Sequence, residues 1–201
     1  MIIRRRKKQL IQKSVFNPTK LVEPHKIFGR LGNSLFQYAT LIALAADTKS
    51  DVYFQDTKWF GKYEKEIQQM FGAGIGSRPE VAIHVRRGDY VELSDRYPDL
   101  SRTDYYTRAI ALFPEDDFLV FSDDIPYAKT LFQGPKFCFS EGLSPVQDLN
   151  QMASCKHQII ANSSYSWWGA YLNKNPNKIV VCPRQELWGS KISLPDSWKQ
   201  L

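Results

Sequence analysis

Short apolar segments alternate with helix-like segments through the second half of the sequence, and this alternation restricts the possible folds more than any other feature. Four segments have the length and composition of buried strands, and helix-like segments lie between them: strands at 81–85, 118–122, 158–161 and 178–182, helices at 103–113, 126–132, 146–155 and 164–173. Strands that are buried on both faces and connected by helices form parallel sheets. The sequence therefore predicts an α/β fold in which helices cover Rossmann-type parallel sheets.

The first half of the sequence carries a shorter version of the same pattern. A short apolar run precedes an Ala- and Leu-rich helix, and a strand and an amphipathic helix follow: the run at 26–28, the helix at 34–47, the strand at 51–54 and the second helix at 63–71. The glycines of 72-GAGIG-76 indicate a linker after that helix. We therefore expect three parts: a basic arm at 1–24, a reduced Rossmann-like half at 25–78, and a Rossmann-like domain at 79–201.

Positive charge is concentrated in the first twenty residues. They include seven basic residues and no acidic one, whereas the other 181 residues carry 20 basic and 21 acidic residues. Because the body of the chain is nearly neutral, we do not expect a nucleic-acid-binding protein. The run 4-RRRKK-8 is interpreted as a solvated arm, with contact to a membrane surface or to nucleic acid as the sharper alternative.

Targeting signals and cysteines indicate where the chain works. We find neither an apolar run long enough to span a bilayer nor the apolar core of a secretion signal behind the basic N-terminus. A cytoplasmic protein is therefore expected, and its oligomeric state is left open. Cys138, Cys155 and Cys182 are far apart, and the first and last lie in apolar segments, which favours buried free thiols over a disulfide or a metal site.

A group of charged residues follows the strand at 81–85. In such sheets ligands bind beyond the carboxyl ends of the strands, and alternation places His84 and Arg86 on the same face of the strand. Burying Arg86 and Arg87 there is costly unless anions contact them. Either Asp89 completes a structural ion pair, or a phosphate or pyrophosphate is held by a forked guanidinium contact. His84 is either a core histidine or part of this site.

A second polar group, 122-SDD-124, follows the next strand. Ser122 and Asp123 could accept hydrogen bonds from a base or a ribose, or they could cap the next helix. Asp123 and Asp124 could instead hold a divalent cation. We favour a site without metal, because the arginine pair already supplies the positive charge that a metal would bring.

Two further groups precede predicted helices. In 29-GRLGN-33, Gly29 and Gly32 permit a tight turn, and Asn33 could cap the helix or reach into a cleft. In the second group, the side chains could either cap the helix or bind phosphate oxygens at its N-terminus: Asn162, Ser163 and Ser164.

These groups occur together in an order that resembles a known family. The segments are 29-GRLGNSLFQYA-39, 83-IHVRRGDY-90, 120-VFSDDI-125 and 148-DLNQMASCKHQIIANSSYSWWGAYLN-173. They resemble the alpha-1,2-fucosyltransferases of glycosyltransferase family 11, and the similarity continues from 178-KIVVCP-183 to 194-LPDSWKQL-201. The segment between the GRLGN helix and the VAIHVRRGD strand is shorter than is usual in that family, which makes the N-terminal, acceptor-side half a reduced one.

The resemblance implies a GT-B-like enzyme with GDP-fucose between two Rossmann-type units. It also implies an inverting, metal-independent transfer of fucose to a sugar hydroxyl, commonly the 2-position of a galactose, so the partners are GDP-fucose and a glycan acceptor and no cofactor is expected. The alternative is a non-catalytic, shortened homologue that binds a GDP-sugar or a glycan.

The resemblance also implies roles for particular residues. Arg86 would contact the donor diphosphate, with Arg87 and Asp89 holding the motif and the nucleotide, and His84 and Asp89 are candidate general bases. The residues expected at the donor site are Gly29, Gly32, Asn33, Arg86, Arg87, Ser122, Asp123, Asn162, Ser163 and Ser164.

Overall fold

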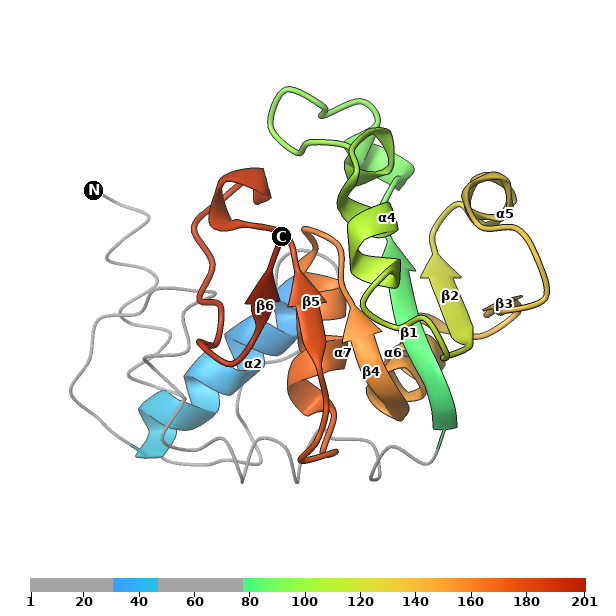
Figure 1. Cartoon of the computed structure of the whole chain (residues 1–201). Helices are drawn as coiled ribbons and strands as arrows, with labels where there is room; N and C mark the ends of the chain where they lie inside the picture. The colour runs from blue at the N-terminus through green and yellow to red at the C-terminus, as the bar shows by residue number, and fades with distance from the viewer. Residues whose placement is uncertain (1–30, 47–77) are drawn as a thin grey trace. The chain divides into compact units, whose positions relative to one another are not determined.

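The computed structural model describes residues 31–46 and 78–201 of the chain (Figure 1). The chain divides into two units, residues 1–67 and 68–201. In the first unit the structure describes helix α2 (Leu31–Ala46), which begins three residues before the predicted helix and places Gly32 in its first turn rather than in a loop. The other predictions for the first half, including those for Gly29, the linker and the basic arm, lie outside the described residues.

The second unit contains a six-stranded sheet in which all paired strands are parallel. The strand order is β3-β2-β1-β4-β5-β6, which is the doubly wound Rossmann order. The strands are β1 (Arg78–Val85), β2 (Phe118–Ser122), β3 (Phe137–Phe139), β4 (Cys155–Ile159), β5 (Val180–Cys182) and β6 (Lys199–Gln200). The predicted α/β fold with a Rossmann-type parallel sheet is therefore confirmed for this unit.

Helices cover both faces of the sheet, as the nearly continuous apolar strands require. Those on the first face are α4 (Tyr105–Ile110) and α5 (Ile125–Leu131). Helices α6 (Pro145–Ala153) and α7 (Ser164–Leu172) lie behind the sheet in the view of Figure 1. None of the helices in the described part of the chain is long and apolar enough to cross a membrane.

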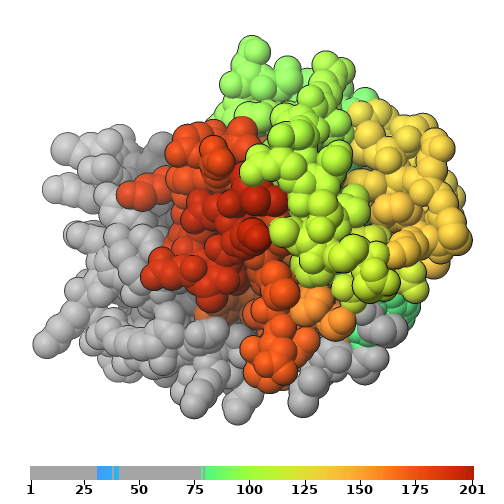
Figure 2. Space-filling view, viewed as in Figure 1, coloured from blue at the N-terminus to red at the C-terminus, as the bar shows by residue number. Residues whose placement is uncertain are grey.

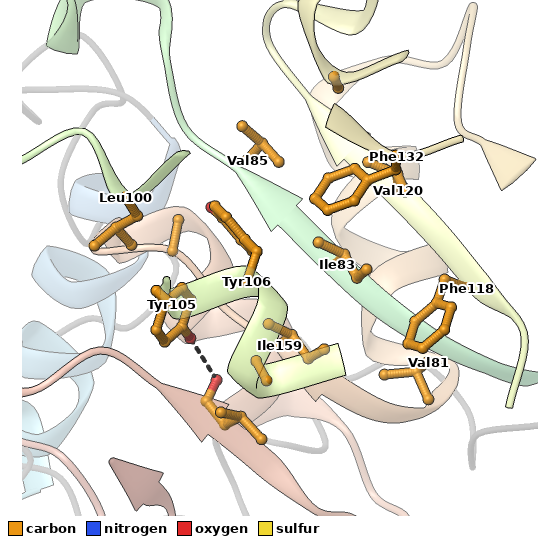
Figure 3. Close-up of a cluster of buried hydrophobic side chains, with 14 of the residues drawn as sticks. Val81, Ile83, Val85, Leu100, Tyr105, Tyr106, Phe118, Val120, Phe132 and Ile159 are labelled. Carbon is orange, nitrogen blue, oxygen red and sulfur yellow. Dashed lines mark hydrogen bonds between the residues drawn. The ribbon is translucent and has the colours of Figure 1, made fainter. Parts of the chain in front are cut away.

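The larger core lies between the sheet and α4 (Figure 3). Alternate residues of β1, namely Val81, Ile83 and Val85, point into it, and the hydroxyl of Tyr105 donates a hydrogen bond to the carbonyl oxygen of Ile160 at 2.6 Å. The C-terminal segment packs beside the segment that contains α4 (Figure 2), where Tyr105 also reaches the carbonyl oxygen of Val181 at 3.1 Å. This packing fixes β1 in the middle of the domain.

A smaller core lies on the opposite face of the sheet. Ala82 and Leu119 pack there with Met152 of α6. A side chain at Gly169 of α7 would collide with the Met152 sulfur, so this glycine allows α6 and α7 to approach closely. Because Ala82 and His84 alternate with Ile83 and Val85, the predicted separation of His84 from Val85 agrees with the structure.

Local hydrogen bonds explain where the helices begin and end. Ser144 and Gln147 form a reciprocal capping box at the start of α6. At the end of α7, the Lys178 ammonium donates to the carbonyl oxygens of Ala170 and Asn173 at 2.8 and 2.7 Å. These contacts pair backbone groups that lack a partner within the helix.

The structure corrects several boundaries that the sequence predicted. Strands β3 and β6 were not predicted, because segments of three and two residues are too short for a periodic pattern. Helix α6 ends at Ala153 and β4 begins at Cys155, so the predicted helix ran too far and the predicted strand began too late.

All three cysteines are free, but Cys138 is exposed on the edge strand β3, whereas we expected it to be buried.

Candidate nucleotide-binding site

The order of the sheet reverses between β1 and β4, because the chain runs from β1 outward to β3 and then crosses to β4 on the other side. In doubly wound sheets this reversal opens a crevice at the carboxyl ends of the strands, where ligands bind. Arg86 follows β1 and Asp123 follows β2, and Asn162 lies two residues after Ile160, the last residue to pair with β5. The structure therefore brings these three predicted residues to the same edge of the sheet.

Arg86 is held between two carboxylates. Its guanidinium forms ion pairs with Asp89 and Asp123, and it lies 5.1 Å from the centre of the Tyr90 ring. The side chain is only 10% exposed. A side chain at Gly88 would collide with the Asp123 carboxylate, which explains why glycine follows the arginine pair. The planar fork that donates to these carboxylates has the shape that also suits a phosphate group.

Arg87 makes a different set of contacts. Its backbone N–H donates to Asp123 Oδ1 at 2.9 Å, whereas its guanidinium donates to Asp124 at 3.1 Å and to Asp99 at 3.3 Å. The guanidinium also covers the Tyr127 ring, 3.5 Å from the ring centre. Neither Asp99 nor Tyr127 was expected in the site, since they are separated from the motif in sequence and belong to no strand-end pattern.

The turn after β2 is organised by its own side chains. Ser122 Oγ accepts a hydrogen bond from the backbone N–H of Asp124 at 2.9 Å, and Asp124 caps α5 by accepting from the N–H of Tyr127 at 3.1 Å. Asp123 and Asp124 also form ion pairs, Asp123 with Arg86 and Asp124 with Arg87. Within residues 31–46 and 78–201, no group of three His, Cys, Asp or Glu side chains is placed to hold a metal ion.

His84 lies beneath this cluster, on the α7 side of the sheet. It is 4% exposed, and its ring centre lies 5.5 Å from that of Tyr165. Burial, with a further contribution from the charge of Arg86, lowers the pKa of His84 to about 3. The imidazole is therefore neutral at pH 7 and a weak base. The proposed catalytic role of His84 stays a prediction.

The carboxyl end of β4 is neutral and holds neighbouring loops together. The side-chain amide of Asn162, which is 3% exposed, donates to the carbonyl oxygens of Pro98 at 3.0 Å and Leu187 at 2.8 Å. The Tyr90 hydroxyl donates to the backbone carbonyl of Asn162 at 3.2 Å. The loops after β1 and β5 are thus tied to the end of β4.

Ser163 and Ser164 begin α7. Ser163 is the N-cap, and its hydroxyl accepts a hydrogen bond from the N–H of Tyr165 at 3.3 Å. Contact between these serines, or Asn162, and a donor phosphate stays a prediction. So do the donor contacts of Gly32 and Asn33, which lie in the first turn of α2.

A pocket of about 490 Å³ opens beside Ser122, between the N-terminal parts of α5 and α6. It is lined by Ser122, Ile125, Pro126, Lys129, Ser140, Glu141, Gly142, Leu143 and Asp148. Asp148 accepts a hydrogen bond from Ser140 Oγ at 2.6 Å, and partial burial raises the pKa of its carboxyl group. Apart from Ser122, this pocket was not predicted, because its residues come from three segments that meet only in the folded chain.

The sheet order and the position of Arg86 at its switch point define a Rossmann-type α/β domain with a candidate anion site. The family model described as Glycosyl transferase family 11 matches residues 60–186. The chain belongs to this family, which confirms the resemblance seen in the sequence.

Three curated relatives extend this comparison. The chain is 38% identical to the O-antigen biosynthesis glycosyltransferase WbnK of Escherichia coli, over 60% of this chain and 44% of the relative. It is 29% identical to an alpha-1,2-colitosyltransferase of Escherichia coli, over 74% of this chain and 61% of the relative. It is 31% identical to galactoside 2-alpha-L-fucosyltransferase Sec1 of Mus musculus, over 54% of this chain and 34% of the relative. The chain thus matches less than two thirds of the length of each relative, and no solved structure matches it significantly.

Proposed function

We propose that this chain carries the donor site of an inverting glycosyltransferase that moves fucose from GDP-fucose to a sugar hydroxyl, forming an alpha-1,2 link to a galactoside. The observation that carries the proposal is the position of Arg86, at the carboxyl end of β1 and beside the switch point of a Rossmann-type sheet. Membership of family 11 and the names of the relatives support the choice of reaction.

The charge of Arg86 suits the chemistry of this transfer. Breaking the bond between the fucose anomeric carbon and the phosphate leaves growing negative charge on GDP. A fixed guanidinium stabilises that charge more strongly in the transition state than in the ground state, which raises the rate. When the diphosphate binds, it would take the place of Asp89, the more exposed of the two carboxylates, in the fork of Arg86. The arginine supplies positive charge, so we propose no metal.

The pocket beside Ser122 suits the base of such a donor. Its volume of about 490 Å³ lies in the range of small-molecule sites, and Ile125, Pro126 and Leu143 offer apolar surface to a flat ring. The Asp148 carboxylate can accept hydrogen bonds from the ring N–H and the amino group of guanine. Uracil lacks that pair of adjacent donors, so we expect the pocket to prefer GDP over UDP.

Two alternatives differ from this function, one in the sugar that is transferred and the other in the absence of transfer. The relative named alpha-1,2-colitosyltransferase matches the largest share of this chain among the three relatives above, so colitose is a second candidate for the transferred sugar. The alternative from another class is a domain that binds the GDP-sugar or a glycan without transfer. The reduced segment before β1 motivates that alternative.

Titration calorimetry and a transfer assay distinguish these possibilities. We would measure binding of GDP, UDP and GDP-fucose, and then incubate the protein with GDP-fucose or GDP-colitose and a β-galactoside, identifying products by mass. Tight binding of GDP with fucosyl transfer is expected. Arg86→Met should weaken GDP binding by about tenfold to 100-fold, whereas Arg108→Met, which removes an exposed arginine that pairs with Asp104, should bind GDP as the parent does. GDP binding without transfer to any galactoside would favour the binding domain, and an absence of GDP binding would rule out the donor site.

A further inference from the structure

The two arginines of 83-IHVRRGD-89 point to different parts of the protein. Arg86 lies in the candidate anion site, whereas the Arg87 guanidinium is directed toward α5 and the 3-10 helix Leu100–Arg102. The Arg87 side chain is 18% exposed. One of its faces covers the Tyr127 ring, and its edge donates to Asp99 and Asp124.

Together with Ser101, these residues form a closed set of contacts, called here the Arg87 network. The Tyr127 hydroxyl is 2.9 Å from Ser101 Oγ, and Ser101 Oγ donates to Asp99 Oδ1 at 2.5 Å. Asp99 Oδ2 in turn accepts from Arg87, whose guanidinium stacks on Tyr127. Turning the guanidinium toward a ligand would break two ion pairs and a cation–π contact together, which makes its present orientation strongly favoured.

The Arg87 network is linked to Arg86 through the turn after β2. Arg87 and Asp124 are joined by an ion pair, and Asp124 also caps α5, so the position of this turn depends on Arg87. The neighbouring Asp123 uses one carboxylate oxygen to accept from the Arg87 backbone N–H and the other to pair with Arg86. A shift of this turn would therefore change the orientation of the Arg86 fork.

We propose that Arg87 is a positioning residue: it does not contact the donor, and it acts on Arg86 through the Asp123–Asp124 turn. This replaces the expectation that both arginines hold the nucleotide. Asp99 and Tyr127 share the positioning role because they contact the Arg87 guanidinium, and Ser101 joins these two residues. The inference rests on the proposed function only for the identity of the ligand.

A double-mutant cycle tests the proposal. GDP affinity is measured by calorimetry for the intact chain and for Arg86→Met, Arg87→Met and the double variant. If Arg87 acts through Arg86, Arg87→Met weakens binding by roughly tenfold in the parent and by less than about twofold when Arg86 is already methionine. An equal loss in both backgrounds would mean that Arg87 contacts the donor by itself, and the proposal would be overturned.

The same four proteins give a readout that needs no ligand. Because both arginines share the Asp123–Asp124 turn, we expect the two single changes to lower the melting temperature by more in sum than the double change does. Additive shifts would overturn the coupling. If the intact chain binds no GDP, the proposed function fails, and the melting temperatures still decide the positioning role.

Milder substitutions in the Arg87 network keep the proposal testable if the arginine variants fail to fold. Tyr127→Phe keeps the ring beneath Arg87 and removes only the contact with Ser101, whereas Tyr127→Leu removes both contacts. GDP affinity should fall more for leucine than for phenylalanine, and neither change should matter when Arg86 is methionine. Arg108→Met is the matched control for loss of an arginine elsewhere on the domain. Equal effects of both Tyr127 changes in both backgrounds would contradict the proposal.

Discussion

The carboxyl ends of β1 and β4 are neighbours in the sheet, yet the structure uses them in different ways. At the end of β1 and β2, charged side chains face one another, and Arg86 is paired with Asp89 and Asp123. At the end of β4, neutral hydrogen bonds from Asn162 hold two loops in place. Ion pairs can exchange with a charged ligand, whereas saturated amide contacts are costly to break. We therefore expect a ligand at the first end, whereas the second end positions loops.

The largest effect is expected from Arg86→Lys, which keeps the charge at the β1 end. A lysine ammonium cannot make the forked contact of a guanidinium, so transfer of fucose should fall by about 100-fold, as for loss of one donor to a developing anion. Steady-state kinetics with GDP-fucose and a galactoside measure it. Arg108→Lys is the control for an arginine replaced on the surface of α4. Wild-type transfer by the Arg86 variant would remove the distinction between the two ends.

At the β4 end, Asn162→Ala should act on stability first. The change leaves the carbonyl oxygens of Pro98 and Leu187 without their amide donor, which should lower the free energy of unfolding by about 2 kcal/mol. Urea denaturation measures this loss, and the exposed Asn177→Ala is the matched control. GDP affinity should fall less than it does for Arg86→Lys. A variant that unfolds like the parent but loses GDP would place Asn162 on the ligand instead.

His84 lies beneath the charged end of the sheet and makes the free energy of unfolding depend on pH. Its pKa is about 3 in the folded chain and near 6.5 when exposed, so below pH 6.5 the unfolded chain binds a proton that the folded chain does not. Its contribution to stability is complete above pH 6.5 and is lost as the pH falls toward 3, at about 1.4 kcal/mol per pH unit. Urea denaturation between pH 7 and pH 5 should show this slope.

Replacing the imidazole isolates its part in that slope. His84→Gln should remove most of the slope because glutamine does not titrate. His157→Gln should keep most of it, since the lowering of the His157 pKa by burial and Lys156 is partly opposed by Asp116. Equal slopes for the parent and the His84 variant would show that the buried imidazole is not the group that titrates.

The difference between the two arginines also shows how far the sequence could be interpreted. Four strands (β1, β2, β4 and β5) and the helices between them were predicted, and with them the strand-end position of Arg86, because these depend on local periodicity. The direction of Arg87 was not predictable, since strand alternation ends at the turn and the orientation depends on Asp99 and Tyr127. Distant partners of this kind, like those that form the pocket around Asp148, leave no periodic signal.

The smallest expected effect belongs to Ser163, which also tests the neutral end of the sheet. Its hydroxyl caps α7, so Ser163→Ala should lower the free energy of unfolding by about 1 kcal/mol, while Ser163→Asp, which can also cap, should restore most of the loss. GDP affinity separates this role from the predicted phosphate contact. An alanine variant with reduced stability and unchanged affinity assigns Ser163 to the cap alone. Affinity that falls with alanine, and further with aspartate because of charge repulsion, would place a phosphate at this helix N-terminus and extend the ligand site from β1 to β4.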